Sequence, residues 1–145
     1  MTSDLSGIIK QKTHFFQIRV FYEDTDFTGI VYHANYLKFA ERGRTNFLRL
    51  LGISHSELIS SNEPKHFVVY KMNSKFLGTS TIEYILEVKS IFIGIKGVRL
   101  KIDQDIFKGE KKLFSASVEF ALLDKNAKPM KFPEDMKLKI KKYLN

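Results

Sequence analysis

The spacing of apolar side chains changes once near the start of the chain, from every second residue to every third or fourth. From His14 to Tyr22 apolar and polar residues alternate, which is the period of a half-buried β-strand. From Ala34 to Leu51 apolar residues recur among charged ones at three-to-four spacing, which predicts an amphipathic helix of about five turns. Gly52 is a suitable residue to end that helix.

Strand-like patterns dominate the rest of the chain, and a turn at Lys108–Lys111 joins the last two. The predicted strands are His66–Leu77, Thr81–Ile95, Lys96–Phe107 and Leu113–Leu123. The alternation in the last strand indicates one solvated face, as in antiparallel sheets. Pro133, followed by two acidic residues, predicts the start of a short C-terminal helix.

These elements predict an α+β fold in the order β-α-β-β-β-β, with a short helix at the C-terminus. One long helix is available for the sheet, so we expect a five-stranded antiparallel sheet wrapped around that helix. One sheet face then stays under-covered, which favours self-association into a homo-oligomer.

Length and composition bound the class of protein. The 145 residues, 43% of them apolar, are typical of one globular domain over 1–145 and exclude a disordered chain. The absence of cysteine excludes disulfides, a thiolate zinc site and a cysteine nucleophile. Residues 1–12 carry no signal-like apolar stretch, and we expect them to be flexible. No segment is apolar enough to span a membrane, so a cytoplasmic protein is expected.

The charge balance suggests an anionic partner. Lys and Arg number 24 against 16 Asp and Glu, a net charge of +8, which suits nucleic acid, anionic lipid or a phosphorylated small molecule. A non-enzymatic basic binding module is therefore one alternative. It leaves the acidic loop described next unexplained, since carboxylates repel a polyanion.

The segment Tyr22–Tyr36 holds the densest group of chemically useful side chains, with three acids, one histidine and three tyrosines in fifteen residues. It joins the first strand to the long helix, where two rigid elements can position a site. A simpler interpretation is that Asp24 and Asp26 cap turns, Gly29 supplies an unusual φ angle and His33 is incidental.

A carboxylate in front of a helix N-terminus favours acyl transfer. The unpaired N–H groups of the first turn can hold a carbonyl oxygen as it becomes an oxyanion, at about 3 kcal/mol per donor. The carboxylate can attack the carbonyl carbon or deprotonate a water molecule that does. Thioesters suit this arrangement because their thiolate leaving group needs little acid assistance. No metal and no cofactor is required.

The same residues resemble a known signature. The pattern is Arg19-Val20, four residues, Thr25-Asp26, two residues, then Gly29-Ile30-Val31-Tyr32, and it resembles the 4-hydroxybenzoyl-CoA thioesterase family. The continuation His33-Ala34-Asn35-Tyr36, with Glu41-Arg42-Gly43-Arg44, is similar to the Tol-Pal-associated acyl-CoA thioesterase branch. The resemblance runs from about His14 to Pro133. It implies a hotdog fold, a dimer with a continuous sheet and commonly a tetramer.

The resemblance also implies roles for individual residues. Asp26 is the catalytic carboxylate, as nucleophile or general base, with His33 beside it at the helix N-terminus and Tyr22 lining the same pocket. Acyl-CoA is the implied substrate, so that coenzyme A is part of the substrate, and acyl groups on acyl carrier protein are the alternative. The residues assigned to substrate binding are Gly29, Val31, Tyr32, Asn35 and, for the CoA phosphates at a subunit interface, Lys96 and Arg99.

Three positions depart from the family pattern. Tyr32-His33-Ala34 stands where hydroxybenzoyl-specific members carry Trp-Tyr-Pro, which counts against an aromatic acyl group and favours a fatty or short-chain one. Phe27 stands where the branch usually has a small residue. Gly43 lies in the middle of the helix, where glycine is unfavourable unless a close backbone approach at an interface requires it.

Overall fold

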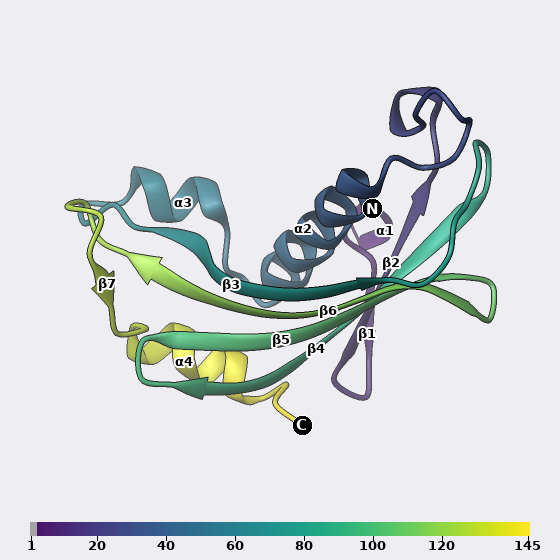
Figure 1. Ribbon diagram of the computed structural model, residues 1–145. Coiled ribbons are helices and arrows are strands. Elements are labelled where there is room, and N and C mark those ends of the chain that lie inside the picture. Colours follow the sequence, from purple (N-terminus) through teal and green to yellow (C-terminus); the bar gives the residue numbers. More distant parts are fainter. Residues whose placement is uncertain (1–2) are drawn as a thin grey trace.

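One curved antiparallel sheet wraps around the long helix α2 in the computed structural model, which describes residues 3–145 (Figure 1). The elements in chain order are α1 (Ser3–Ser6), β1 (Ile8–Lys10), β2 (Thr13–Arg19), the 3-10 turn η1 (Tyr22–Asp24), α2 (His33–Leu50), α3 (His55–Ser60), β3 (His66–Phe76), β4 (Ile85–Lys96), β5 (Arg99–Lys108), β6 (Lys111–Leu123), β7 (Pro129–Met130) and α4 (Glu134–Lys141).

The sheet has two very different edges. Its strand order is β1-β2-β4-β5-β6-β3, and β7 adds to β6 beside the end of β5. The β1 edge is three residues long, whereas the β3 edge is eleven residues long and pairs with β6 along one side. Within residues 3–145, β3 is therefore the one long strand with an open side.

The predicted sheet around one helix and the short C-terminal helix are confirmed, but the number of strands was wrong. The five predicted strands correspond to β2, β3, β4, β5 and β6, and the sheet has seven because β1 and β7 join it. Strands of three and two residues are too short to display a period of two. β1 lies in the segment expected to be flexible, where Ile8–Lys10 pair with Thr13–Phe15. The part of that expectation on Met1 and Thr2 lies outside the described residues.

The core lies between α2 and the concave face of the sheet. The Phe47 ring of α2 stacks on Phe92 of β4 with centroids 4.4 Å apart, and Tyr36 near the helix start stacks on Phe114 of β6 at 5.8 Å. At the other end of α2, Tyr143 beyond α4 packs edge-on against Phe47 at 6.3 Å. Both ends of the helix are thus fixed by aromatic contacts.

Gly43 lets α2 approach the sheet closely. A Cβ at this position would lie 2.8 Å from Cγ1 of Val88, so no larger residue fits without movement. Beside it, the amide Nε2 of Gln104 donates to the carbonyl of Ala40 at 2.9 Å, and Arg44 donates to Gln104 Oε1 at 2.9 Å. A close approach at an interface was expected at Gly43, and the close approach found is instead to the sheet of the same chain. This contact fixes the helix over β4 and β5.

Candidate functional site

The loop between β2 and α2 is held in place by short backbone pairings. Thr25 and Val31 form an antiparallel bridge, and Ile30 forms another with Thr81. The Val31 N–H also donates to the carbonyl of Ser80 at 2.9 Å. The loop is therefore a small, well-anchored hairpin in front of the long helix.

Asp24 is the structural acid of this loop. It is buried, and its Oδ2 accepts the N–H of Phe21 at 2.8 Å. Its backbone carbonyl accepts both the Tyr32 N–H at 2.9 Å and the side-chain amide of Asn35 at 2.8 Å. These bonds tie the turn η1 to the first turn of α2.

Asp26 is the chemically available acid. It begins a tight turn in which the Gly29 N–H donates to the Asp26 carbonyl at 3.0 Å, and Gly29 takes a φ of +86°, which favours glycine. The Oδ1 atom of Asp26 accepts hydrogen bonds from the Thr28 hydroxyl at 2.5 Å and from the Thr28 N–H at 2.8 Å. The Thr28 hydroxyl, then the Thr28 N–H and more weakly the charge of His33, hold the pKa of Asp26 below its usual value. The carboxylate is ionised at neutral pH.

The charge of His33, at the start of α2, acts weakly on this carboxylate. His33 is the first residue of α2 and is exposed, and its ring is 4.7 Å from that of Tyr32 and 5.7 Å from that of Phe76 in β3. The first N–H groups of a helix have no intrahelical acceptor. Tyr22, 83% exposed in η1, and Phe27, fully exposed at the tip of the turn, project from the same loop.

Two residues assigned to substrate binding instead have buried side chains. Val31 is 3% exposed and belongs to the core, and Asn35 is 8% exposed with its amide committed to Asp24. Both support the loop. Tyr32 remains 47% exposed against the His33 ring, and Gly29 forms the turn.

Lys96 and Arg99 are not close to Asp26 within one chain. They pair across the β4–β5 turn, which lies at the opposite end of the sheet from the β2–α2 loop (Figure 1). The Arg99 guanidinium lies 3.6 Å from the centre of the Tyr70 ring. With Ile93, Gly94, Ile95, Lys101 and Glu119, they line a surface hollow of about 300 Å³. Lys96 and Arg99 could contact a substrate bound at Asp26 only if they came from a second chain.

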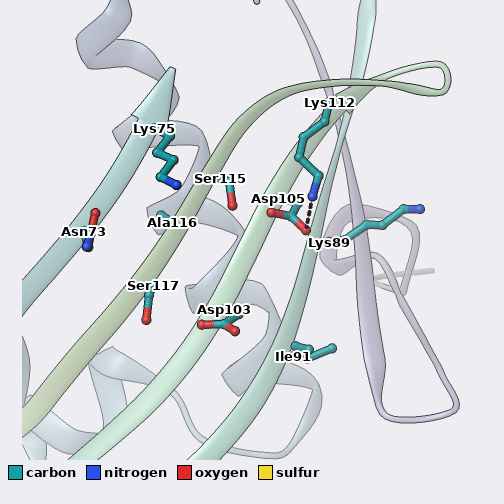
Figure 2. Close-up of a pocket in the computed structure, with 10 residues that line it drawn as sticks. All are labelled: Asn73, Lys75, Lys89, Ile91, Asp103, Asp105, Lys112, Ser115, Ala116 and Ser117. Atoms are coloured by element: carbon teal, nitrogen blue, oxygen red, sulfur yellow. Dashed lines mark ion pairs between the residues drawn. The ribbon is translucent and has the colours of Figure 1, made fainter. Parts of the chain in front are cut away.

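A hollow of about 470 Å³ lies on the outer face of the sheet, away from α2 (Figure 2). It is lined by both signs of charge, and Lys112 forms an ion pair with Asp105 at 3.4 Å. Lys75 and Asp103 also line it, and the Lys89 side chain extends away from the other lining residues (Figure 2). The β2–α2 loop contributes none of its lining residues, so this hollow is separate from the Asp26 site.

A smaller pocket of about 120 Å³ lies between α2, α3 and β3, and sequence reasoning did not find it. At its polar side the Thr45 hydroxyl is 3.2 Å from Glu41 Oε1 and 3.2 Å from His55 Nε2. Its other lining residues are Arg44, Leu48, Phe67, Val68, Val69 and Phe120. The signal was missed because α3 itself was not predicted, so His55 had no assigned neighbours.

The geometry at Asp26 suits attack on a carbonyl group. An ionised carboxylate can attack carbon directly or remove a proton from water, while helix N–H groups hold the developing oxyanion. No three or more His, Asp or Glu side chains in the described part of the chain converge to hold a metal ion. None of the helices within residues 3–145 has the length and apolar character needed to cross a membrane.

Known proteins resemble this chain over most of its length. A family model described as thioesterase-like superfamily matches residues 20–140. The chain is 34% identical over 123 residues to the acyl-CoA thioesterase YbgC of Haemophilus influenzae, covering 84% of this chain and 90% of that protein. It is 37% identical over 98 residues to the acyl-CoA thioester hydrolase YbgC of Escherichia coli O6:H1, covering 68% and 72%. The crystal structure of a probable thioesterase from Bartonella henselae matches with a TM-score of 0.81 at 41% identity, covering 83% of this chain and 99% of that one.

Proposed function

The chain belongs to the thioesterase-like superfamily, and on that premise we propose that it hydrolyses acyl-CoA thioesters to a free acid and CoA, with Asp26 as the essential carboxylate. It has a hotdog fold and is a thioester hydrolase, which replaces the alternative of a non-enzymatic basic binding module. The observation that supports Asp26 is its solvent-accessible carboxylate, whose pKa is lowered by the Thr28 hydroxyl and N–H and more weakly by the charge of His33 at the start of α2.

In the proposed reaction the first-turn N–H groups of α2 bind the thioester carbonyl oxygen. Asp26 either attacks the carbonyl carbon, giving an anhydride that water then opens, or removes a proton from the attacking water. In both routes the C–S bond breaks, CoA leaves as a thiolate and one water molecule is consumed. His33 orients the attacking water or the Asp26 carboxylate, and Tyr22 borders the space where the substrate binds. Val31 and Asn35 contribute by holding the loop.

The test is thiol release from short-chain, long-chain and aromatic acyl-CoAs by the wild-type protein and by Asp26→Asn. We expect the variant to lose at least a hundredfold in kcat, because the reacting group is gone while the fold remains. Glu23→Gln, an exposed acid three residues away, is the matched control and should keep its activity. A folded Asp26→Asn protein with full activity would refute the mechanism. Single turnover in ¹⁸O-labelled water tests the nucleophilic route, because label in the Asp26 carboxylate requires that water opened an anhydride at the aspartyl carbonyl.

We further propose that the chain forms a dimer through the open edge of β3, giving a continuous sheet, and that dimers pair into tetramers through the mixed-charge outer face. The length of the open edge supports this, because unpaired strand edges favour pairing with another chain. In a two-fold dimer, the β4–β5 turn of one chain, with Lys96 and Arg99, would lie toward the Asp26 loop of the other chain.

Arg99 is proposed to bind the CoA phosphates across this interface. Arg99→Ala should therefore raise KM for acyl-CoA more than it lowers kcat, because a binding contact equally strong in the ground state and the transition state affects KM. Steady-state kinetics with one acyl-CoA measures both constants. A fall in kcat at unchanged KM would contradict a purely binding role.

The finer family assignment rests on the motif of the β2–α2 loop. We assign the chain to the Tol-Pal-associated branch of the 4-hydroxybenzoyl-CoA thioesterase family, and to the cytoplasm. Acyl carrier protein is the alternative carrier of the acyl group, because a net charge of +8 suits an acidic partner. Comparing kcat/KM on one acyl group attached to CoA and to the carrier protein decides between them.

A further inference from the structure

A basic surface lies where the short helix α4 and the β1–β2 turn meet (Figure 1). The Lys12 ammonium group donates to the carbonyl of Leu144 at 3.0 Å, so this turn touches the segment that follows α4. We call this region the α4 surface, and its cations are Lys10, Lys12, Lys137, Lys139, Lys141 and Lys142. None of these lysines forms an ion pair within residues 3–145. Their charges are therefore available to a partner.

The two sides of α4 differ in character. Met136 and Ile140 are 5% and 0% exposed and belong to the core. Leu138 is two residues from each of them, which places it on the opposite side of the helix, and it is 61% exposed. Lys141 and Lys142 follow Leu138 by one turn, so they lie beside it on the helix surface. The outermost part of α4 is thus a leucine next to ammonium groups.

The charge of α4 is unevenly distributed along its axis. Glu134 and Asp135 lie in the first turn, where the positive end of the helix dipole stabilises carboxylates. Lys139 and Lys141 lie in the last turn. Positive charge is therefore concentrated at the C-terminal end of α4, which is also the end next to the β1–β2 turn.

Two features of the α4 surface favour an anionic lipid bilayer as its partner. Its six cations are all lysines, which act as point charges and suit mobile headgroups, whereas arginine suits carboxylates or phosphates at fixed positions. The second feature is Leu138. An exposed apolar side chain among lysines can enter the boundary between headgroups and acyl chains, as in helices that lie on membranes.

We propose that the α4 surface docks the protein on an anionic lipid bilayer, with its lysines against the headgroups and Leu138 inserted between them. The inference goes beyond the proposed function, because vesicle binding requires neither Asp26 nor a thioester. Fatty acids and long-chain acyl-CoAs are amphiphiles that dissolve in bilayers. A docked enzyme would therefore meet them at the membrane surface.

The charge contribution is tested by cosedimentation with vesicles of phosphatidylglycerol and phosphatidylcholine. We expect binding that weakens as salt is added, since salt screens exposed charges. Lys141→Gln combined with Lys142→Gln should weaken binding about twenty-five-fold, because each lysine near an anionic surface contributes about a fivefold factor. Circular dichroism verifies that the variant is folded.

The matched control removes the same charge elsewhere. Lys125→Gln combined with Lys128→Gln changes two exposed lysines of the β6–β7 turn, where Lys125 lies beside the α3–β3 loop. This pair should lower vesicle affinity less than about twofold, because its distance from the bilayer exceeds the screening length. Equal losses in the two double variants would show that net charge alone attracts the protein, and would overturn the proposal. Absence of wild-type binding to the mixed vesicles would also overturn it.

Insertion of Leu138 is tested by fluorescence, since the sequence contains no tryptophan. Leu138→Trp introduces a single fluorophore at the proposed contact, and its emission should shift to shorter wavelength when mixed vesicles are added. Ile59→Trp, on α3 at 59% exposure, is the matched control and should show no shift. Double-stranded DNA is the alternative polyanion. Binding to DNA as tight as to vesicles, or an unchanged emission of Leu138→Trp on the vesicles, would overturn the assignment to a bilayer.

Discussion

At the scale of single residues, Thr28 lowers the pKa of Asp26. Its hydroxyl and its N–H both donate to Asp26 Oδ1, and both lower the pKa of that carboxyl. Thr28→Val removes the hydroxyl donor and keeps the shape, so the pKa of Asp26 should rise toward its ordinary value. The acid limb of the pH profile of kcat/KM should then move to higher pH.

The pH profile of the wild-type protein and of Thr28→Val checks this prediction. Thr25→Val is a suitable control, because the Thr25 hydroxyl donates to the carbonyl of Tyr22 and not to Asp26. An acid limb that moves to lower pH, or does not move, would show that another group limits the rate.

His14 makes stability depend on pH. It is fully buried, its Nε2–H donates to the carbonyl of Ser6 at 2.7 Å, and its ring stacks between Phe16 and Phe47. Burial lowers the pKa of His14, so below the unfolded value of about 6.5 the unfolded chain binds a proton more readily than the folded one. The free energy of unfolding should therefore decrease as the pH falls below about 6.5, until the folded protein also takes up the proton.

Thermal unfolding between about pH 8 and about pH 5 measures this effect. His14→Gln keeps an N–H donor for Ser6 and does not titrate, so its Tm should depend less on pH over that range. His66→Gln, at an exposed position of β3, should keep the wild-type dependence. Equal slopes for the His14 variant and the wild-type protein would contradict the assignment.

At the scale of elements, Gly43 sets the distance between α2 and the sheet. Gly43→Ala places a methyl group 2.8 Å from Val88 Cγ1. Overpacking of this kind costs about 1–3 kcal/mol, which exceeds the gain in helix propensity of about 1 kcal/mol. Urea unfolding should therefore give a lower free energy of unfolding for Gly43→Ala.

A paired substitution identifies the cause. Val88→Ala in the Gly43→Ala background removes the clashing methyl group, so the two changes together should cost less than the sum of their separate costs. Strict additivity would show that the loss at Gly43 has another origin.

The long elements were predictable and the short ones were not. Apolar periodicity located α2 to within one residue at each end, because eighteen residues contain several full turns. It also located the long part of every major strand. β1 and β7 are fixed by pairing with neighbouring strands, and α3 has no buried residue that would mark a periodic face. Local pattern contains little information about such elements.

The candidate site divides in the same way. That Asp26, His33 and Tyr22 lie in or next to one loop was predictable because they are close in sequence at the start of one helix, and their roles in catalysis stay predictions. The supporting roles of Asn35 and Val31 were not predictable. Both residues lie beside the site in sequence, but the fold buries their side chains. The pocket at Thr45 joins three elements that are distant along the chain, so only the fold brings Thr45, His55 and Phe67 together.

At the scale of the whole molecule, the β3 edge is predicted to determine assembly. Val69 lies on the concave face of this edge and is 47% exposed. Val69→Lys would bury a charge at the proposed interface, so the protein should sediment as a monomer with an unchanged circular dichroism spectrum. Ile8→Lys on β1, at 46% exposure, is the matched control and should leave assembly unchanged. A Val69→Lys protein that remains a dimer would exclude this edge as the interface.

The unequal edges of the sheet would also limit the growth of the proposed assembly. A sheet with two long open edges can add copies at both sides and extend into a fibre. Here the three-residue β1 edge offers little backbone to a further chain, and the eleven-residue β3 edge is used up when two copies pair. In the proposed dimer both outer edges of the continuous sheet are therefore short β1 strands, and we expect the sheet to stop growing at two copies. The three-residue strand β1, which the sequence pattern did not reveal, would then prevent further chains from adding at the edges.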